Sequence, residues 1–228
     1  MSRCLLLDTS MWGLVVGVGV DGILIDFTYF PEQRAVARSM TDHVHALLQR
    51  NGLSREDLEE IRVSQGPGSF TGIRMGLAWA YGFSAGTREI PLFGMSSLEA
   101  ITEALHAKQE ANQLRTAVFL ENKGAAGYIT VVDGPTATYA CEISSNRIAH
   151  LTGVQELVRW VRPWAAIEST PWAQQAAGRA LGEAEYVQLV LHGMLRKMTK
   201  EADTHPLPRY LRGSTAEEAL AKKKGTLV

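Results

Sequence analysis

Short apolar runs open the chain, and the second and third of them are rich in β-branched residues. The runs span Cys4–Asp8, Trp12–Val20 and Ile23–Phe30, and Asp21-Gly22 separates the second run from the third. Apolar runs of this length are typical of strands, and Asp-Gly between two of them is a strong signal for a two-residue hairpin. The chain is therefore predicted to begin with three strands, of which the second and third are antiparallel.

The spacing of apolar residues then changes to that of a helix. Between Gln33 and Arg50 they recur on one predicted helical face, and Asn51-Gly52 ends the segment. The apolar positions are Val36, Met40, Val44, Leu47 and Leu48. Ser54 and Asp57 predict a second helix start of the capping-box type, with Asp in place of the usual Glu.

A glycine-rich loop follows the next apolar run. Ile61–Gln65 indicates a short strand, Gly66–Gly72 holds three glycines and one proline, and a helix is expected to run on to about Ala85. Ser69 or Thr71 is the expected N-cap of that helix. A strand, a glycine-rich turn and a helix N-terminus together expose backbone N–H groups to one spot, which suits an anion or a closely docked backbone.

The rest of the chain repeats this order more weakly. Strands and helices are expected in alternation up to an extended segment at Pro206 and Pro208. The expected strands are Pro91–Gly94, Thr116–Leu120, Gly127–Val132, Thr136–Cys141 and Ala165–Glu168. The expected helices are Ser96–Glu110, Val154–Trp160, one starting at Pro171, Tyr186–Lys200 and Ala216–Lys224.

A β-β-β-α-β-α unit followed by a shorter echo of itself indicates an α/β fold with two lobes. The order resembles the repeat unit of the actin-like, Hsp70-like and sugar-kinase-like ATPase superfamily (ASKHA), a ribonuclease H-like fold in which each lobe is a mixed sheet with flanking helices. On this interpretation residues 1–110 form the lobe with the glycine-rich loop, and residues 111–200 form a smaller, divergent lobe. Residues 201–228 are expected to pack back on the first lobe.

Composition narrows the range of partners. The chain of 228 residues has 23 Lys and Arg against 24 Asp and Glu, so charge gives no reason to expect tight binding of nucleic acid by the chain alone.

Cys4 and Cys141 form no metal-ligand spacing, and Cys4 is expected to be a buried free thiol of a reducing compartment. Four glycines and Asp21 break the apolar stretch Met11–Ile25, so no membrane span is expected and a cytoplasmic location is the default.

The segment Asp8-Thr9-Ser10 is the candidate site for phosphate or metal. A carboxylate followed by two hydroxyls can coordinate hydrated Mg²⁺. The alternative is that Asp8 caps a turn and that the two hydroxyls bond nearby backbone groups. The later half shows no second acidic site or adenosine-binding loop, and the glycine-rich loop lacks the Lys and Ser/Thr of a Walker phosphate loop. A phosphate or metal site here is therefore predicted to be vestigial.

The residue pattern gives peptidase chemistry little support. His43 and His45 lie two positions apart, so on a helix they point to different faces. The sequence has no His-x-x-x-His pair to hold zinc and no Gly-x-Ser-x-Gly nucleophile motif. A glycoprotease-type (M22-like) peptidase and a small-molecule kinase of the same fold are the alternatives to a protein without catalysis of its own.

Four segments resemble the TsaB family, also called YeaZ. They are Leu7–Ser10, the loop Gly66–Gly72 with Arg74 and Gly76, Pro91–Leu98, and Pro208–Arg212. The loop is the most specific of these motifs. The family usually carries an Asp-Ala-Arg strand and then Glu-Val-Tyr in the middle of the chain, where Glu121-Asn122-Lys123 and Gly127-Tyr128-Ile129 stand here. The resemblance is therefore weakest in the second lobe.

This resemblance implies a non-catalytic subunit. TsaB-like proteins are similar in fold to the catalytic subunit TsaD, lack its metal and nucleotide residues, and pair with TsaD and the ATPase TsaE. That bacterial complex transfers a threonylcarbamoyl group to N6 of adenosine 37 in tRNAs reading ANN codons. The resemblance implies no cofactor held tightly by this chain alone, with ATP and a divalent metal on the partner subunits. It also implies contact with tRNA only through the complex, and a homodimer is a further candidate state.

The partner surface is predicted on the loop and on two helices, Gln33–Arg50 and Gly72–Ala85. Small residues on the second helix would let another helix approach closely, and packing on the chain's own sheet is the alternative. The predicted partner-binding residues are Gly66, Pro67, Gly68, Ser69, Phe70, Thr71, Gly72, Arg74, Gly76 and Ala80. Gly68 and Gly72 are expected to hold a positive φ or a close backbone contact, and Arg74 to meet a carboxylate.

Overall fold

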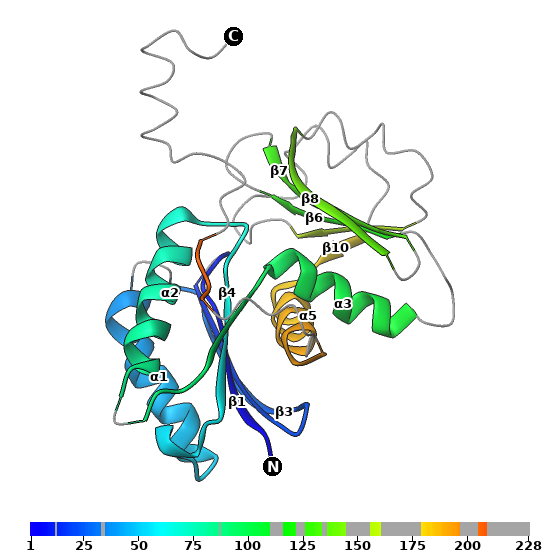
Figure 1. Cartoon of the computed structure of the whole chain (residues 1–228). Coiled ribbons are helices and arrows are strands. Elements are labelled where there is room, and N and C mark those ends of the chain that lie inside the picture. The colour runs from blue at the N-terminus through cyan, green and yellow to red at the C-terminus, as the bar shows by residue number, and fades with distance from the viewer. Residues whose placement is uncertain are drawn as a thin grey trace, which may run out of the picture.

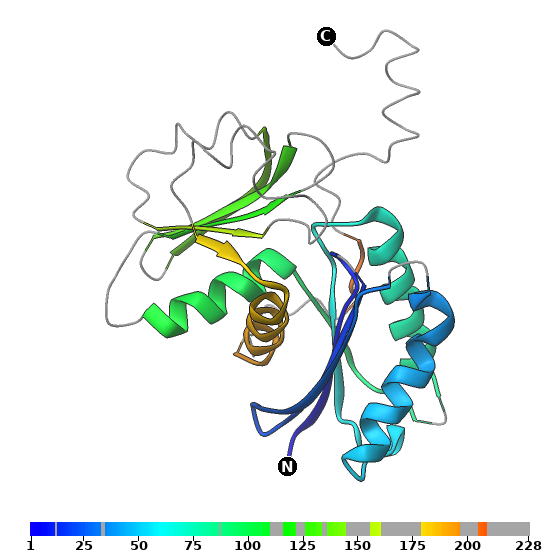
Figure 2. The ribbon, with the colours of Figure 1, turned by 180° about the vertical axis from the view of Figure 1, so that it is seen from behind.

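The structure is a computed structural model with two mixed sheets and helices between and beside them (Figures 1 and 2). It describes residues 1–11, 13–32, 35–86, 88–109, 116–121, 126–133, 136–144, 156–160, 179–196 and 205–208. The expected elements at Ala165–Glu168, from Pro171 and at Ala216–Lys224 lie outside these residues, as does the family motif after Pro208. The α/β architecture predicted for an actin-like and Hsp70-like chain is confirmed.

The first sheet contains all three strands predicted at the start of the chain. Its members are β1 (Arg3–Asp8), β2 (Leu14–Val20), β3 (Ile23–Phe30), β4 (Glu60–Ser64) and β5 (Leu92–Met95), in the order β3-β2-β1-β4-β5. β2 is antiparallel to β1 and β3, whereas β1, β4 and β5 are parallel. Asp21 and Gly22 turn the hairpin with φ of 50° and 79°, the left-handed backbone that a tight Asp-Gly turn requires.

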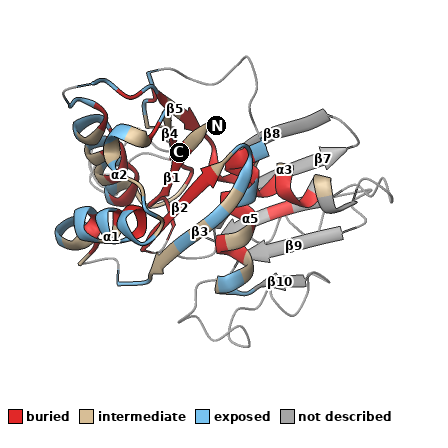
Figure 3. Cartoon of the chain, turned by 90° about the horizontal axis from the view of Figure 1, so that it is seen from below, coloured by how far each residue is buried: buried red, intermediate tan, exposed pale blue. Residues whose placement is uncertain are grey.

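Helices cover both faces of the first sheet. Successive side chains of β1 point to opposite faces, so β1 contributes to two hydrophobic clusters, one on each face. Leu5 and Leu7 pack with α1 (Val36–Arg50) and α2 (Phe70–Ser84). Figure 1 shows these two helices on one side of the sheet. Cys4 and Leu6 pack on the opposite face with α3 (Ser97–Gln109) and α5 (Glu183–Arg196). Figure 3 shows the result, a sheet whose strands are buried apart from β3.

The second sheet repeats the topology of the first. Its strands are β6 (Thr116–Glu121), β7 (Ala126–Asp133), β8 (Thr136–Ser144), β9 (Glu156–Trp160) and β10 (Arg179–Leu181). The order β10-β9-β6-β7-β8 places an antiparallel meander beside two parallel strands, just as in the first sheet. This correspondence agrees with the predicted echo of one structural unit.

The prediction of a helix over Val154–Trp160 is wrong. Residues 156–160 form strand β9, which pairs in parallel with β6 from Thr116↔Glu156 to Leu120↔Trp160. A short apolar run fits a buried strand as well as a helical turn, because periodicity cannot separate the two over so few residues. Pairing with a strand from another part of the chain decides the outcome.

Two further elements differ in extent from the predictions. The Ser54–Asp57 capping box is present, but it begins only the short 3-10 helix η1 (Arg55–Asp57). The final helix α5 begins at Glu183, three residues before the predicted start at Tyr186. Although α5 falls within residues 111–200, it packs against β1 and β2 of the first sheet. The lobe boundaries at residues 110 and 200 stay predictions.

Cys4 is a buried free thiol, as the sequence predicts. Burial raises the pKa of Cys4 from an ordinary 9.0 to about 11. Because the folded-state pKa lies above the unfolded value, the contribution of this thiol to stability is complete below the ordinary pKa and is lost as the pH rises through about 11. The native thiol should therefore resist modification at pH values near neutrality.

Thiol titration of a Cys141→Ser variant measures this protection directly. At pH 8 a disulfide reagent should leave native Cys4 unreacted and should modify it fully after addition of guanidinium chloride. Rapid modification of the native variant would show that Cys4 is reachable from solvent.

Candidate functional site

The glycine-rich loop lies between β4 and α2 and is closely docked on the segment Asp8-Thr9-Ser10 at the end of β1. The backbone N–H of Ser69 donates to the carbonyl of Ser10 over 2.5 Å. The Thr9 hydroxyl donates to the carbonyl of Gly72 over 2.8 Å. Ser69 is the N-cap of α2, and its Oγ accepts from the Gly72 N–H at 3.2 Å. Of the two predicted N-caps, Ser69 is the one that the structure uses.

Three glycines make this docking sterically feasible. A Cβ on Gly68 or Gly72 would overlap the backbone carbonyl of Ser10 or Thr9, and a Cβ on Gly76 would overlap the Thr9 hydroxyl. Gly68 also has a φ of +157°. The expectation of a positive φ or a close backbone contact at Gly68 and Gly72 is therefore confirmed.

The start of α3 holds the loop from a second direction. The Ser97 N–H donates to the carbonyl of Gly66 over 2.9 Å, and the Ser97 hydroxyl donates to the carbonyl of Pro67 over 3.1 Å. Gly66, Pro67 and Ser97 are all buried. Of the two interpretations of the loop, an anion cradle or a docked backbone, these contacts favour the docked backbone, here that of the chain itself.

Asp8, Thr9 and Ser10 are at most 2% exposed. The Tyr186 hydroxyl of α5 donates to Asp8 Oδ2 over 2.7 Å, and the Ser10 N–H donates to Asp8 Oδ1 over 2.9 Å. Burial and the neighbouring Asp8 carboxylate raise the pKa of Tyr186 well above its ordinary value, so its hydroxyl remains a donor at neutral pH. Both Asp8 oxygens thus serve the fold, as in the turn-capping interpretation. Among the described residues, no group of three His, Cys, Asp or Glu is arranged to hold a metal ion.

The predicted partner-binding residues of α2 lie on two faces of the helix, one buried and one exposed. Gly72, Gly76 and Ala80 are buried against Thr9 and the core, so in this arrangement they pack on the chain's own sheet. Thr71 and Arg74 are exposed and Phe70 is half-buried. The Arg74 guanidinium lies 3.9 Å from the centre of the Phe70 ring. A partner on this helix would therefore meet Phe70, Thr71 and Arg74, with Gly76 and Ala80 behind them.

Aromatic side chains fill the seam between α1 and α2. Trp79 donates its indole N–H to the Thr41 hydroxyl over 3.0 Å, and its ring stacks on Phe83 with 4.6 Å between centroids. The His45 ring lies 6.4 Å from that of Phe83. Trp79 and Phe83 therefore hold the two helices together, whereas Tyr81 is 39% exposed and faces outward.

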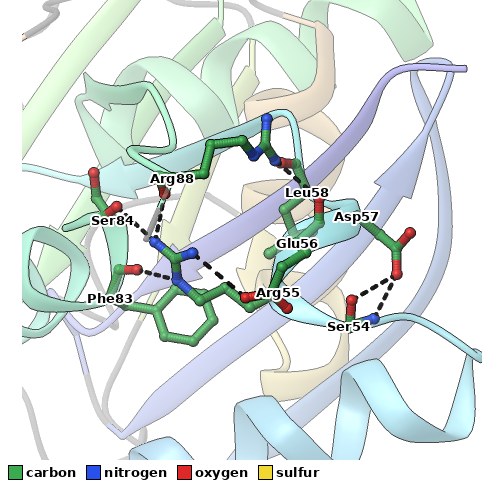
Figure 4. A network of polar contacts seen from close by, with 8 residues as sticks. All are labelled: Ser54, Arg55, Glu56, Asp57, Leu58, Phe83, Ser84 and Arg88. Atoms are coloured by element: carbon green, nitrogen blue, oxygen red, sulfur yellow. Dashed lines mark hydrogen bonds and ion pairs between the residues drawn. The ribbon is translucent and has the colours of Figure 1, made fainter. Parts of the chain in front are cut away.

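Sequence reasoning missed the arginines that organise this half of the molecule. Figure 4 shows Arg55 of η1, whose guanidinium donates to the carbonyls of Phe83 and Ser84 at the end of α2 over 2.8 and 2.7 Å. Arg88 donates in return to the carbonyl of Glu56 over 3.0 Å. Helix ends leave carbonyls without intrahelical partners, and the two arginines satisfy some of them. No local pattern predicts such contacts across about thirty residues of sequence.

The structural role of Arg62 was also not predicted from the sequence. A charged residue within an apolar strand is nevertheless a recognisable signal of such a role. Arg62 is 6% exposed and donates to the carbonyls of Met194 and Leu195 at the end of α5 over 2.5 and 3.0 Å. Its Nε donates to the Glu60 carboxylate over 2.9 Å. A cation at a helix C-terminus interacts favourably with the helix dipole. Arg62 therefore ties α5 to β4.

A short part of the C-terminal region lies beside the loop and α2. Pro206 is buried, and its carbonyl accepts from the Tyr81 hydroxyl at 3.1 Å. The Gln65 amide donates to the carbonyl of Leu207 over 2.8 Å. The described residues 205–208 thus contact the first half of the molecule.

Comparison with known proteins agrees with this arrangement. Residues 31–120, which include α1, the loop and α2, match the family model described as TsaD: tRNA N6-adenosine threonylcarbamoyltransferase. The chain is 26% identical to the tRNA threonylcarbamoyladenosine biosynthesis protein TsaB of Escherichia coli, over 97% of this chain and 100% of that protein. TsaB of Bacillus subtilis is 33% identical over 98 residues, which are 42% of each chain.

Solved structures support the same fold. YeaZ from Pseudomonas aeruginosa has a TM-score of 0.68 at 21% identity, covering 92% of this chain and 100% of that one. Together with the two sheets of matching topology, these comparisons show an α/β fold of the actin-like and Hsp70-like type. Within that fold class, the chain is similar to proteins of the TsaB (YeaZ) family. None of the helices in the described part of the chain is long and apolar enough to cross a membrane.

Proposed function

We propose that this chain is a non-catalytic subunit in the biosynthesis of tRNA threonylcarbamoyladenosine. It supports a TsaD-like catalytic subunit as a scaffold or activating partner, together with a TsaE-like ATPase, in forming N6-threonylcarbamoyladenosine at position 37 of tRNAs reading ANN codons. Similarity to E. coli TsaB over almost the whole chain supports this pathway. The proposal places the chain in the cytoplasm, where it reaches tRNA only through the complex.

The hydrogen bonding of Asp8 carries the non-catalytic part of the proposal. Asp8 is 1% exposed, and each of its carboxylate oxygens already accepts a hydrogen bond within the fold, from the Tyr186 hydroxyl and the Ser10 N–H. The backbone of the glycine-rich loop lies against Thr9 and Ser10. This docking favours a loop that shapes a surface for a partner protein over a loop that binds a ligand. ATP and a divalent metal are accordingly assigned to the partner subunits.

The exposed side of α2 next to the loop is the proposed contact for the TsaD-like subunit. Phe70 and Arg74 form a stacked pair at the first turns of the helix, and Tyr81 lies about two turns further on. An arginine held over an aromatic ring is pre-organised to pair with a carboxylate of a partner. The exposed side of α1 continues this surface, since Trp79 and Phe83 bind the two helices to one another.

Reconstitution tests the proposal. A TsaD-like subunit, a TsaE-like ATPase, threonylcarbamoyl-AMP and tRNA should form modified adenosine 37 efficiently only when this chain is added. The isolated chain should show no peptidase and negligible ATPase activity. Metal-dependent turnover by the purified chain that disappears in Asp8→Asn would instead support the peptidase or kinase alternative.

Arg74→Ala should weaken assembly without unfolding the chain. Because Arg74 is exposed, we expect a nearly unchanged melting temperature and roughly a tenfold loss of affinity for the TsaD-like subunit, the loss typical of an interface arginine. Isothermal titration calorimetry measures the affinity, and the yield of modified tRNA should fall in parallel. Arg196→Ala, at the exposed end of α5, is the charge-matched control and should bind normally. Equal affinities for both variants would place the interface elsewhere.

A further inference from the structure

Tyr186 is linked to the N-terminus of α2 by consecutive hydrogen bonds through buried residues. Its hydroxyl donates to Asp8 Oδ2 over 2.7 Å, and Asp8 Oδ1 accepts from the Ser10 N–H at 2.9 Å. The carbonyl of Ser10 accepts in turn from the N–H of Ser69, the N-cap of α2, at 2.5 Å. Tyr186, Asp8 and Ser10 are at most 2% exposed, so water does not compete for these bonds.

The contact between the two segments leaves little room for independent movement. Thr9, between Asp8 and Ser10, donates to the Gly72 carbonyl over 2.8 Å. Even a methyl group on Gly68 or Gly72 would overlap the backbone of Ser10 or Thr9. A shift of the segment Asp8-Thr9-Ser10 must therefore move the loop and the first turn of α2 with it.

We propose that Tyr186 is a positioning residue for the partner surface, because it holds the glycine-rich loop and the first turns of α2 through Asp8 and Ser10. The inference rests on the proposed function, since it assigns the partner contact to the Phe70–Arg74 pair at those turns. It connects two distant parts of the chain, because α5 directly follows β10 of the second sheet. The position of α5 thus determines the geometry that the TsaD-like subunit meets.

The tyrosine hydroxyl, rather than the ring, is the group that performs this role. The ring is buried in the core cluster that α3 and α5 share, so phenylalanine would keep its packing. Phenylalanine would leave Asp8 Oδ2 without the donor that now fixes the carboxylate. Tyr186→Phe therefore removes the first hydrogen bond of this chain of bonds and keeps the packing of α5.

Hydrogen exchange of the loop amides tests the coupling without any partner. In Tyr186→Phe, the amides of Ser69 and Gly72 should exchange at least roughly tenfold faster, the factor expected when one hydrogen bond to a buried carboxylate is lost. Thr9→Val, which removes the bond to the Gly72 carbonyl at nearly constant volume, should have the same effect at these amides. Asp8→Ala, which removes the acceptor of the Tyr186 hydroxyl, takes the place of Tyr186→Phe as the test if that variant fails to fold.

Ser84→Ala is the matched control. It removes a buried hydroxyl that donates to the Ile90 carbonyl over 2.6 Å at the opposite end of α2. It should lower the melting temperature without accelerating exchange at Ser69 and Gly72. Exchange at these amides that is unchanged in Tyr186→Phe, or accelerated equally in Ser84→Ala, would overturn the positioning role.

Affinity for a TsaD-like subunit provides the second readout. Tyr186→Phe should bind about tenfold more weakly, and adding Arg74→Ala should cost less than it does in the wild-type chain, because both changes act on the same surface. Independent, additive losses would overturn the inference. Failure of the wild-type chain to bind would refute the proposed function instead, and the exchange experiment would still decide whether Tyr186 holds the loop.

Discussion

Gly72→Ala is expected to lower the free energy of unfolding by about 2–3 kcal/mol, whereas Gly82→Ala in the same helix should raise it by about 0.5–1 kcal/mol. The added methyl group at Gly72 would overlap the carbonyl of Thr9, so α2 must move away from β1 or the segment after β1 must shift. At Gly82 the methyl group would meet nothing within 4 Å, and alanine favours the helix over glycine.

Urea unfolding of the two variants beside the wild-type chain measures both effects. Because the substitution is the same in both, helix propensity acts equally and the difference reports the contact with Thr9. Similar stabilities for the two variants would show that the segment after β1 adjusts freely. Large substitutions at Gly76 or Ala80 test folding in the same way. For this reason the proposed partner surface is better tested at Arg74.

Arg62→Met is expected to lower the free energy of unfolding by about 3–5 kcal/mol. Methionine would leave the Glu60 carboxylate without its cationic partner and would remove the donor to the carbonyls of Met194 and Leu195. The side chains of Arg62 and Glu60 are only 8% and 16% exposed, so water cannot replace what is lost.

Arg50→Met is the control for this prediction. Arg50 and Asp26 approach to 2.5 Å, the same distance as Arg62 and Glu60, but their side chains are 44% and 30% exposed. Exposed pairs of this kind contribute about 0–1 kcal/mol, so the control should unfold near the wild-type midpoint. Equal losses in the two variants would mean that burial does not govern the strength of these pairs. A small loss for Arg62→Met would mean that α5 is held by apolar packing alone.

Most of the first sheet and its helices could be predicted from the sequence because their signals are local. The five apolar positions predicted for the buried face of the first helix are the five buried residues of α1. The Asp21-Gly22 hairpin and the Ser69 N-cap rest on contacts within a few residues, which local residue types specify.

The failures occurred where a distant segment decides the conformation. Residues 156–160 form a strand because β6 pairs with them, and their own apolar pattern is too short to distinguish strand from helix. The Ser54–Asp57 capping box was recognised correctly, but the chain leaves the 3-10 helix at Leu58 to enter β4. A capping signal marks where a helix begins and carries no information on its length.

The sequence by itself determined that the loop Gly66–Gly72 needs glycine and that Asp8-Thr9-Ser10 ends a buried strand, because residue type alone limits the backbone and the burial that each position tolerates. Only the tertiary structure decided that these two segments dock on each other and that Tyr186, 178 positions after Asp8, supplies the donor for its carboxylate. The tertiary structure also turned Gly76 and Ala80 inward and Arg74 outward. Hydrogen bonds and steric contacts between remote segments depend on how the sheets and helices assemble, and no pattern confined to neighbouring residues encodes them.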